Sequence, residues 1–219
     1  MTHQELIDQI RELYLASRKS KFPMENIERC TSHSISSELE DLLALYCSEL
    51  INDSNVKIYI DPQLSFPDSG LRNSSGRRAF QLRPDLMIVS DNVARIFIDA
   101  KTDIGYKRTE YLTKMREKNE LMAAIVNKQV KFNDGNRCVV SDRITIADDI
   151  SYTYFLASNR FITRSTPIDV DKINGFEFVN IFCATTGYHL NSYEPDASFV
   201  PDEEVLNQFD KLLLSVVNK

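Results

Sequence analysis

Apolar positions along the chain recur at two different spacings. Helical spacing predicts helices over residues 3–18, 36–51, 109–131 and 202–217. Short runs rich in β-branched and aromatic residues predict strands over 56–60, 81–90, 94–101, 151–158 and 176–184. This order of elements favours an α/β fold in which a mixed central β-sheet is flanked by helices.

The size of the chain sets the expected domain organisation. A length of 219 residues suits one well-buried domain and is too short for two large ones. We therefore expect a single domain over 1–219, with a core of about 35–184. The first and last helices would then be flanking elements. The stretch 62–79 is rich in Pro, Ser, Gly and Asn, which predicts a loop.

The composition indicates the cellular compartment in which the protein is expected. No apolar run approaches the roughly 20 residues that span a bilayer, and residues 3–18 have the pattern of an amphipathic helix, unlike a signal peptide. The four cysteines are far apart and form no CxxC pair, which predicts free thiols: Cys30, Cys47, Cys138 and Cys183. We expect a cytoplasmic protein that does not bind a membrane.

Charge is distributed unevenly along the chain. Residues 72–131 hold 13 Lys/Arg against 7 Asp/Glu, whereas the rest of the chain holds 13 against 25. A basic segment on an acidic body is compatible with a localised phosphate-binding surface. Charged side chains that are unevenly distributed over a solvated surface would give the same numbers. Charge alone therefore does not decide between a phosphate-binding surface and an ordinary solvated one.

The strongest chemical signal lies at the end of the predicted strand 94–101. Asp99 and Lys101 are two residues apart and therefore point to the same face, whereas Ala100 points to the other face with Ile96 and Ile98. Asp85 lies on the preceding strand, across a hairpin that turns near Asp91 and Asn92. The two acidic residues and the lysine thus come from neighbouring strands.

The register of this hairpin decides whether the two carboxylates meet. A three-residue loop would place Asp85 opposite Asp99, whereas a two-residue loop would pair Asp85 with Ile98 and put the carboxylates on opposite faces. If the three residues act together, the hairpin needs an odd loop or a bulge around Asp91–Val93.

Two carboxylates held close together repel each other, and a divalent cation stabilises both in the charged form. Ligation by oxygen alone suits Mg²⁺. A neighbouring lysine can orient a water molecule or stabilise a pentavalent phosphate. Two carboxylates, a lysine and a metal together suit phosphodiester hydrolysis.

At these residues the sequence resembles the PD-(D/E)XK nuclease superfamily, whose fold is called restriction-endonuclease-like. The matching residues are Pro84-Asp85 and, after 13 intervening residues, Asp99-Ala100-Lys101. The resemblance covers about residues 35–184 as a pattern of elements. The Pro-Asp pair is common in this chain, but Asp99-Ala100-Lys101 is its single [DE]xK triplet.

The resemblance implies a role for each matching residue. Asp85 and Asp99 would ligate Mg²⁺, for which Mn²⁺ would substitute, the carbonyl of Ala100 would complete the metal site, and Lys101 would be catalytic. The family often adds an acidic residue from the preceding helix, and Glu38, near the edge of the apolar stripe of helix 36–51, is the best match. Glu40 is expected to point further into solvent and, with Ser37, has the spacing of a capping box.

Basic residues flank the predicted site on both sides. We expect the arginines of the loop before Asp85 to contact DNA phosphates or guanine edges, and the two cations after the catalytic strand to do the same. These residues are Arg72, Arg77, Arg78, Arg83, Lys107 and Arg108. On helix 109–131 the cations Lys114, Arg116 and Lys118 alternate with acidic residues, which favours a solvated face.

The leading hypothesis is a Mg²⁺-dependent endonuclease acting on double-stranded DNA, similar to a type II restriction enzyme. By the same resemblance it would act as a homodimer. A repair or phage-type nuclease with structure-specific cutting is the second hypothesis. A catalytically silent nucleic-acid-binding module and a protein-interaction subunit are two further alternatives.

Overall fold

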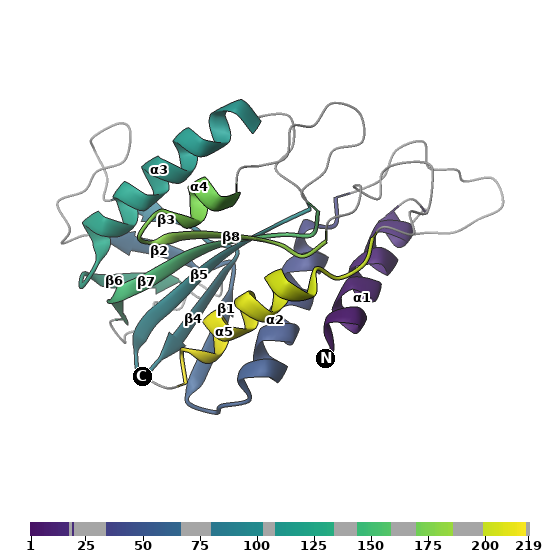
Figure 1. Ribbon diagram of the computed structural model, residues 1–219. Coiled ribbons are helices and arrows are strands. Elements are labelled where there is room, and N and C mark those ends of the chain that lie inside the picture. The colour runs from purple at the N-terminus through teal and green to yellow at the C-terminus, as the bar shows by residue number, and fades with distance from the viewer. Residues whose placement is uncertain are drawn as a thin grey trace.

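The computed structural model describes residues 1–17, 19, 34–66, 80–102, 108–133, 144–158, 170–185 and 199–217. Within these ranges the chain is an α/β protein with five helices and a mixed eight-stranded sheet (Figure 1). The helices are α1 (His3–Ser17), α2 (Ser36–Ile51), α3 (Arg108–Ile125), α4 (Val170–Asn174) and α5 (Glu203–Leu214). The strands are β1 (Val56–Ile60), β2 (Gln63–Phe66), β3 (Phe80–Leu82), β4 (Leu86–Ser90), β5 (Val93–Lys101), β6 (Gln129–Asn133), β7 (Ile144–Leu156) and β8 (Val179–Cys183).

The sheet runs in the order β1-β4-β5-β7-β6-β2-β3, and β8 pairs with β7. β5 is antiparallel to β4 but parallel to β7, and β7 is parallel to β8. The described residues of β5 and β7 are mostly buried, as expected for strands covered on both faces. The predicted mixed sheet with flanking helices is confirmed.

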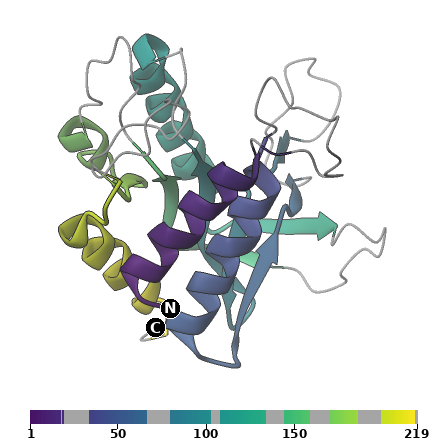
Figure 2. The same cartoon turned by 90° about the vertical axis from the view of Figure 1, so that its right-hand side faces the viewer.

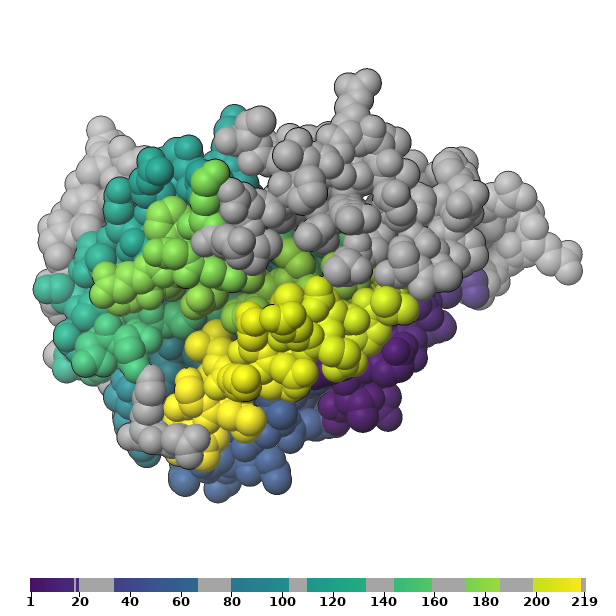
Figure 3. Space-filling view, in the orientation of Figure 1, coloured from purple at the N-terminus to yellow at the C-terminus, as the bar shows by residue number. Residues whose placement is uncertain are grey.

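Helices cover the two faces of the sheet separately. α3 and α4 lie on one face, and α1, α2 and α5 lie on the other (Figure 1). α1 and α2 pack side by side (Figure 2), and α5 crosses the surface between α1 and the α4–β8 region (Figure 3). The sheet therefore has two cores, one on each face.

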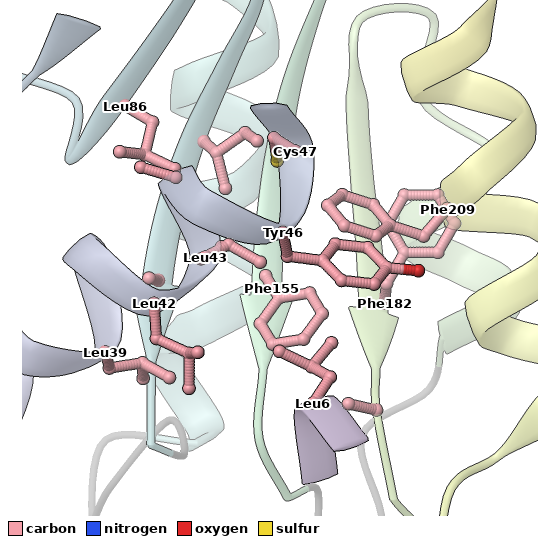
Figure 4. Packing of buried hydrophobic residues seen from close by; sticks show 14 of the residues in the cluster. Leu6, Leu39, Leu42, Leu43, Tyr46, Cys47, Leu86, Phe155, Phe182 and Phe209 are labelled. Atoms are coloured by element: carbon pink, nitrogen blue, oxygen red, sulfur yellow. The ribbon is translucent and has the colours of Figure 1, made fainter. Parts of the chain in front are cut away.

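The core beneath α2 and α5 is rich in aromatic side chains. Tyr46 of α2 stacks on Phe209 of α5 with ring centroids 6.4 Å apart, and Phe155 of β7 lies 5.2 Å from Phe209 (Figure 4). All three side chains are buried. Burying such a side chain stabilises the fold by roughly 1.5–3 kcal/mol, so these rings fix α2 and α5 on the sheet.

Several predicted boundaries are wrong. The residues expected to continue the third helix past Ile125 turn at Asn127, which has a left-handed φ of 58°, and then form β6. The expected loop 62–79 begins with strand β2, and the expected strand 81–90 divides into β3 and β4. The capping box is also wrong, because Ile35 is the N-cap of α2 and no side chain caps it.

Two observations bear on the predicted cellular compartment. Within the described ranges, no helix has the length and hydropathy of a membrane span. Cys47 and Cys183 are buried and form no disulfide, as predicted. Cys30 and Cys138 lie outside the described residues.

Candidate active site

The β4–β5 hairpin carries the chemical residues singled out by the sequence. Its turn consists of Asp91 and Asn92, both with positive φ (51° and 61°), between the paired residues Ser90 and Val93. Two such residues form the two-residue turn that matches the natural twist of a hairpin. Asp and Asn tolerate this conformation better than most residues.

A β-bulge in β5 then shifts the register by one residue. Val89 pairs with Ala94, but Ile88 pairs with Ile96, so Arg95 is the extra residue. Leu86 consequently pairs with Ile98, and Asp85, one residue earlier, falls opposite Asp99. The predicted one-residue shift is present, but its predicted place is wrong: the loop has two residues and the bulge follows it.

The bulge brings the three chemical residues to one face. Met87 and Phe97 both pack in the core beneath α3. Because side chains alternate along a strand, Asp85 lies on the same face as Met87, and Asp99 and Lys101 lie on the same face as Phe97. Asp85, Asp99 and Lys101 therefore share the α3 side of the sheet, where the strands end.

Asp85 is the hydrogen-bonding centre of the group. Its Oδ2 accepts a hydrogen bond from Lys101 Nζ at 2.7 Å and another from the backbone N–H of Ala100 at 2.8 Å. The Asp85 side chain is 19% exposed and that of Lys101 is 42% exposed. The pair lies at the boundary between core and solvent, where a substrate can reach it.

Asp99 lies deeper and interacts with the next strand. It pairs with Tyr154 of β7, and the hydroxyl of Tyr152 donates a hydrogen bond to its carboxylate. Burial raises the pKa of Asp99, and the charge of Asp85 raises it further. Lys101, Lys118 and Tyr152 lower it without cancelling the rise. The two carboxylates therefore repel each other, which favours a cation between them.

Lys101 remains a strong cation in this setting. Burial lowers its pKa, but the charges of Asp99 and Asp85 and the hydrogen bond to Asp85 outweigh burial, so the pKa is raised. Lys101 is therefore suited to act as a fixed positive charge and not as a proton acceptor near neutral pH.

On α2 the structure brings Glu40, which was not among the predicted site residues, into electrostatic contact with Asp85 and Lys101. Burial raises the pKa of Glu40 to about 7, with further contributions from the charges of Asp85 and Asp61. The expectation that Glu40 points into solvent is wrong. Residues two apart on a helix are about 200° apart around its axis, so Glu38 points to nearly the opposite side.

The reason lies in the neighbours along the helix. Glu40 is aligned with Leu43, Ala44 and Cys47, three, four and seven residues on, and all three are buried. Glu38 is aligned with Asp41, Leu42 and Leu45, of which Leu42 is buried and the other two are exposed. The pattern of Leu43, Ala44 and Cys47 was the signal that would have identified Glu40.

Asp61 and Arg83 form a second charged pair beside Asp85. The backbone N–H of Asp61 bonds to the carbonyl of Asp85 at 2.6 Å, and the Asp61 carboxylate accepts hydrogen bonds from the Arg83 guanidinium. Arg83 is 60% exposed. Asp61 directly follows the predicted strand 56–60, and its pairing with Asp85 through β1 and β4 is not visible in the sequence.

Lys118 is a further residue that sequence reasoning missed. The charge pattern of the third helix predicts a solvated position for Lys118, but it faces the sheet, with its Nζ 4.3 Å from the centroid of the Tyr152 ring. It interacts electrostatically with Asp99 and Lys101. Asp99 thus interacts electrostatically with two lysines, Lys101 and Lys118.

The remaining predicted DNA contacts are mostly outside the described residues. Arg72, Arg77, Arg78 and Lys107 lie there, and the side chain of Arg108, which begins α3, is also outside them. Arg83 is the one member of this set whose side chain is described, and it lies next to the site.

The oxygen atoms at the site suit Mg²⁺. Asp85 and Asp99 supply carboxylates, and the N–H of Ala100 points toward Asp85, so the Ala100 carbonyl faces the same side of the strand. Among the described residues no group of three or more His, Cys, Asp or Glu side chains is arranged to hold a metal. Mg²⁺ does not require one, since it often binds through one or two carboxylates and keeps several waters.

Comparison with known proteins adds no family assignment. No protein-family model matches the chain, and no curated protein is significantly similar to it.

Proposed function

We propose that the protein is a Mg²⁺-dependent endonuclease that hydrolyses DNA phosphodiester bonds, most like a type II restriction enzyme and with a restriction-endonuclease-like core. One observation carries the proposal. The bulge at Arg95 sets Asp85 opposite Asp99, on the face that also bears Lys101. Without that extra residue the two carboxylates would lie on opposite faces of the sheet.

In this proposal Mg²⁺ is held by Asp85, Asp99 and the carbonyl of Ala100. When bound, the metal supplies charge neutralisation at the phosphate and lowers the pKa of a water molecule. Asp85 would give up the hydrogen bond that it accepts from Lys101 and would ligate the metal instead. Lys101 is then free to turn its ammonium group toward the attacking water or a phosphate oxygen.

The net reaction consumes one water molecule. Its oxygen bonds to phosphorus and the ester P–O bond breaks. One proton of the water goes to the departing oxygen, and the other is released. Lys101 stabilises the charge that develops on the phosphate, and its raised pKa keeps it protonated for this task.

The decisive experiment is cleavage of plasmid DNA by the purified chain with Mg²⁺ and with EDTA. Asp99→Asn and Lys101→Met should each lower the cleavage rate by on the order of 10²-fold or more. Asp91→Asn is the matched control, because Asp91 is an exposed carboxylate at the turn of the same hairpin. It should cleave like the wild type.

Two results distinguish the alternatives. A wild-type chain that degrades neither DNA nor RNA with Mg²⁺, and behaves like Asp99→Asn, would exclude the nuclease and favour a silent binding module. If cleavage occurs, the DNA ends are sequenced. A recurrent sequence at the ends supports a restriction enzyme, and its absence supports a structure-specific repair or phage-type nuclease.

A further inference from the structure

Lys118 occupies a position on α3 where an apolar residue is expected. The side chains of this helix that face the sheet recur at Tyr111, Met115, Met122 and Ile125, and the last three are fully buried. Lys118 lies three residues after Met115 and four before Met122, so it belongs to this stripe. Its neighbours Lys114 and Arg116 are exposed.

A charged amine in such a stripe is costly unless a partner compensates it. Within the described part of the chain, no carboxylate oxygen lies within 4.0 Å of Lys118 Nζ. Its nearest recorded partner is the face of the Tyr152 ring, at 4.3 Å. A cation over an aromatic face gains only about 0.5–2 kcal/mol, so the stabilisation of Lys118 within the fold is incomplete.

The ring beneath Lys118 ties it to the candidate site. The Tyr152 hydroxyl bonds to Asp99, so the Lys118 ammonium lies beside the carboxylate that would hold the metal. Burial lowers the pKa of Lys118, and the charge of Lys101 lowers it further, against the opposing effect of Asp99. An anion arriving at the site would therefore relieve an unfavourable environment.

We propose that Lys118 binds a non-bridging oxygen of the phosphate at the scissile bond, which makes it a second catalytic lysine. This inference rests on the proposed nuclease function. The two lysines then have separate duties. Lys101 is paired with Asp85 at the metal, whereas Lys118 holds the phosphate from the α3 side. A cation poised over a ring can move to a phosphate without breaking an ion pair.

Lys118→Met tests the proposal, because methionine keeps the length of the side chain and removes its charge. Lys114→Met is the matched control, because Lys114 is an exposed lysine one turn earlier in the same helix. We expect Lys118→Met to lower kcat/KM for DNA by on the order of 10²-fold. Lys118→Arg should recover part of this loss, and Lys114→Met should cleave like the wild type.

Binding to DNA provides a readout that a purely structural role would not change. Affinity is measured over a range of salt concentrations, with Ca²⁺ in place of Mg²⁺. Loss of one phosphate contact should reduce the slope of log affinity against log salt by about 0.9. Lys114→Met should keep the wild-type slope.

The outcomes separate this inference from the proposed function. If the wild type cleaves DNA and Lys118→Met matches Lys114→Met in both assays, the phosphate contact is refuted and the nuclease stands. If Lys118→Met loses cleavage but keeps the wild-type slope of log affinity against log salt, the phosphate contact is also refuted. Lys118 would then be a residue that positions Asp99. A wild type that cleaves nothing refutes both. If Lys118→Met does not fold, Lys118→Gln replaces it.

Discussion

Glu40 of α2 interacts electrostatically with the candidate site. Burial and the charges of Asp85 and Asp61 raise its pKa to about 7. In the proposed metal site, a negative charge on Glu40 would help to attract a divalent cation, although the nearby carboxylates make Glu40 harder to ionise. Mg²⁺ bound nearby would stabilise the ionised form of Glu40.

We therefore predict that Glu40→Gln raises the Mg²⁺ concentration needed for half-maximal cleavage by about 10-fold, the lower end of what an outer-shell ligand contributes. Glu38→Gln serves as the control, since Glu38 lies on the opposite side of the same helix turn. The measurement is a Mg²⁺ titration of the cleavage rate. If Glu38→Gln alone raises the required Mg²⁺ concentration, then Glu38 and not Glu40 is the acidic residue of α2 at the metal site.

At the scale of single residues, the features that the sequence predicts best are those that follow from the alternation of side chains along a strand. The shared face of Asp99 and Lys101 follows from their spacing alone. The sequence favours Glu38 over Glu40 because Glu38 lies on the side of Leu42 and Leu45, but Leu45 is 48% exposed. Lys118 was assigned to solvent because its neighbours are charged, although Met115 and Met122 have the spacing that turns it inward.

At the scale of the element, Arg95 decides whether the hairpin can carry the site. It is the bulged residue of β5, its side chain is 19% exposed, and its guanidinium lies 3.6 Å from Asp149. Ile96 and Ile98 beyond the bulge face the α2 core, and Asp99 faces α3. The whole division of β5 between two cores depends on this one extra residue.

Deletion of Arg95 should therefore remove cleavage, because a one-residue shift turns Asp99 and Lys101 to the other face of the sheet. It should also lower the free energy of unfolding by several kcal/mol, since Ile96 and Ile98 would leave their core. Arg95→Ala is the control. It keeps the residue count and should retain cleavage, with a loss of roughly 1 kcal/mol for the ion pair with Asp149.

Urea unfolding and plasmid cleavage measure the two effects. Full cleavage by the deletion variant would show that the bulge does not set the register. Such a result would remove the main support for the site.

The errors in predicting elements share one cause, which is pairing between distant strands. The sequence predicts β6 as the end of the helix 109–131, because Leu121, Met122 and Ile125 before it have helical spacing. It is a strand because it pairs with both β7 and β2. β2 and β3 are short and pair with each other across residues 67–79, so no local periodicity marks them.

At the scale of the molecule, the two faces of the sheet have different roles. The α3 face bears the candidate site, whereas α1, α2 and α5 form the opposite layer (Figure 2). The amphipathic patterns of the first and last helices predicted both as flanking elements. Their packing on α2 could not be predicted, because it depends on side chains far apart in the sequence.

A polar cluster joins the three helices of that layer. His3 of α1 bonds through Nδ1 to Glu203 at 2.6 Å and through Nε2 to Asp210 at 2.9 Å, both on α5. The hydroxyl of Tyr46 on α2 donates to the other oxygen of Asp210 at 2.5 Å. Burial lowers the pKa of His3, but the hydrogen bonds to Glu203 and Asp210 outweigh burial and raise it above 6.5.

The raised pKa sets the direction of a pH effect on stability. A group whose pKa is higher in the folded state than in the unfolded state stabilises the fold when it is protonated. For His3 this stabilisation is complete below the unfolded pKa of about 6.5. It is lost as the pH rises through the pKa of the folded state. Wild type should therefore exceed His3→Gln in free energy of unfolding by on the order of 1 kcal/mol at about pH 6. The difference should shrink by about pH 9.

Urea unfolding of both proteins at the two pH values provides the test. The comparison is made between the two proteins at each pH because the Met1 amino group, 2.7 Å from Glu49, also has a raised pKa. That contribution is common to both and cancels in the difference. A difference that stays constant or grows with pH would mean that His3 joins α1 to α5 as a neutral ring. The cluster would then act only as a fixed polar contact between the helices.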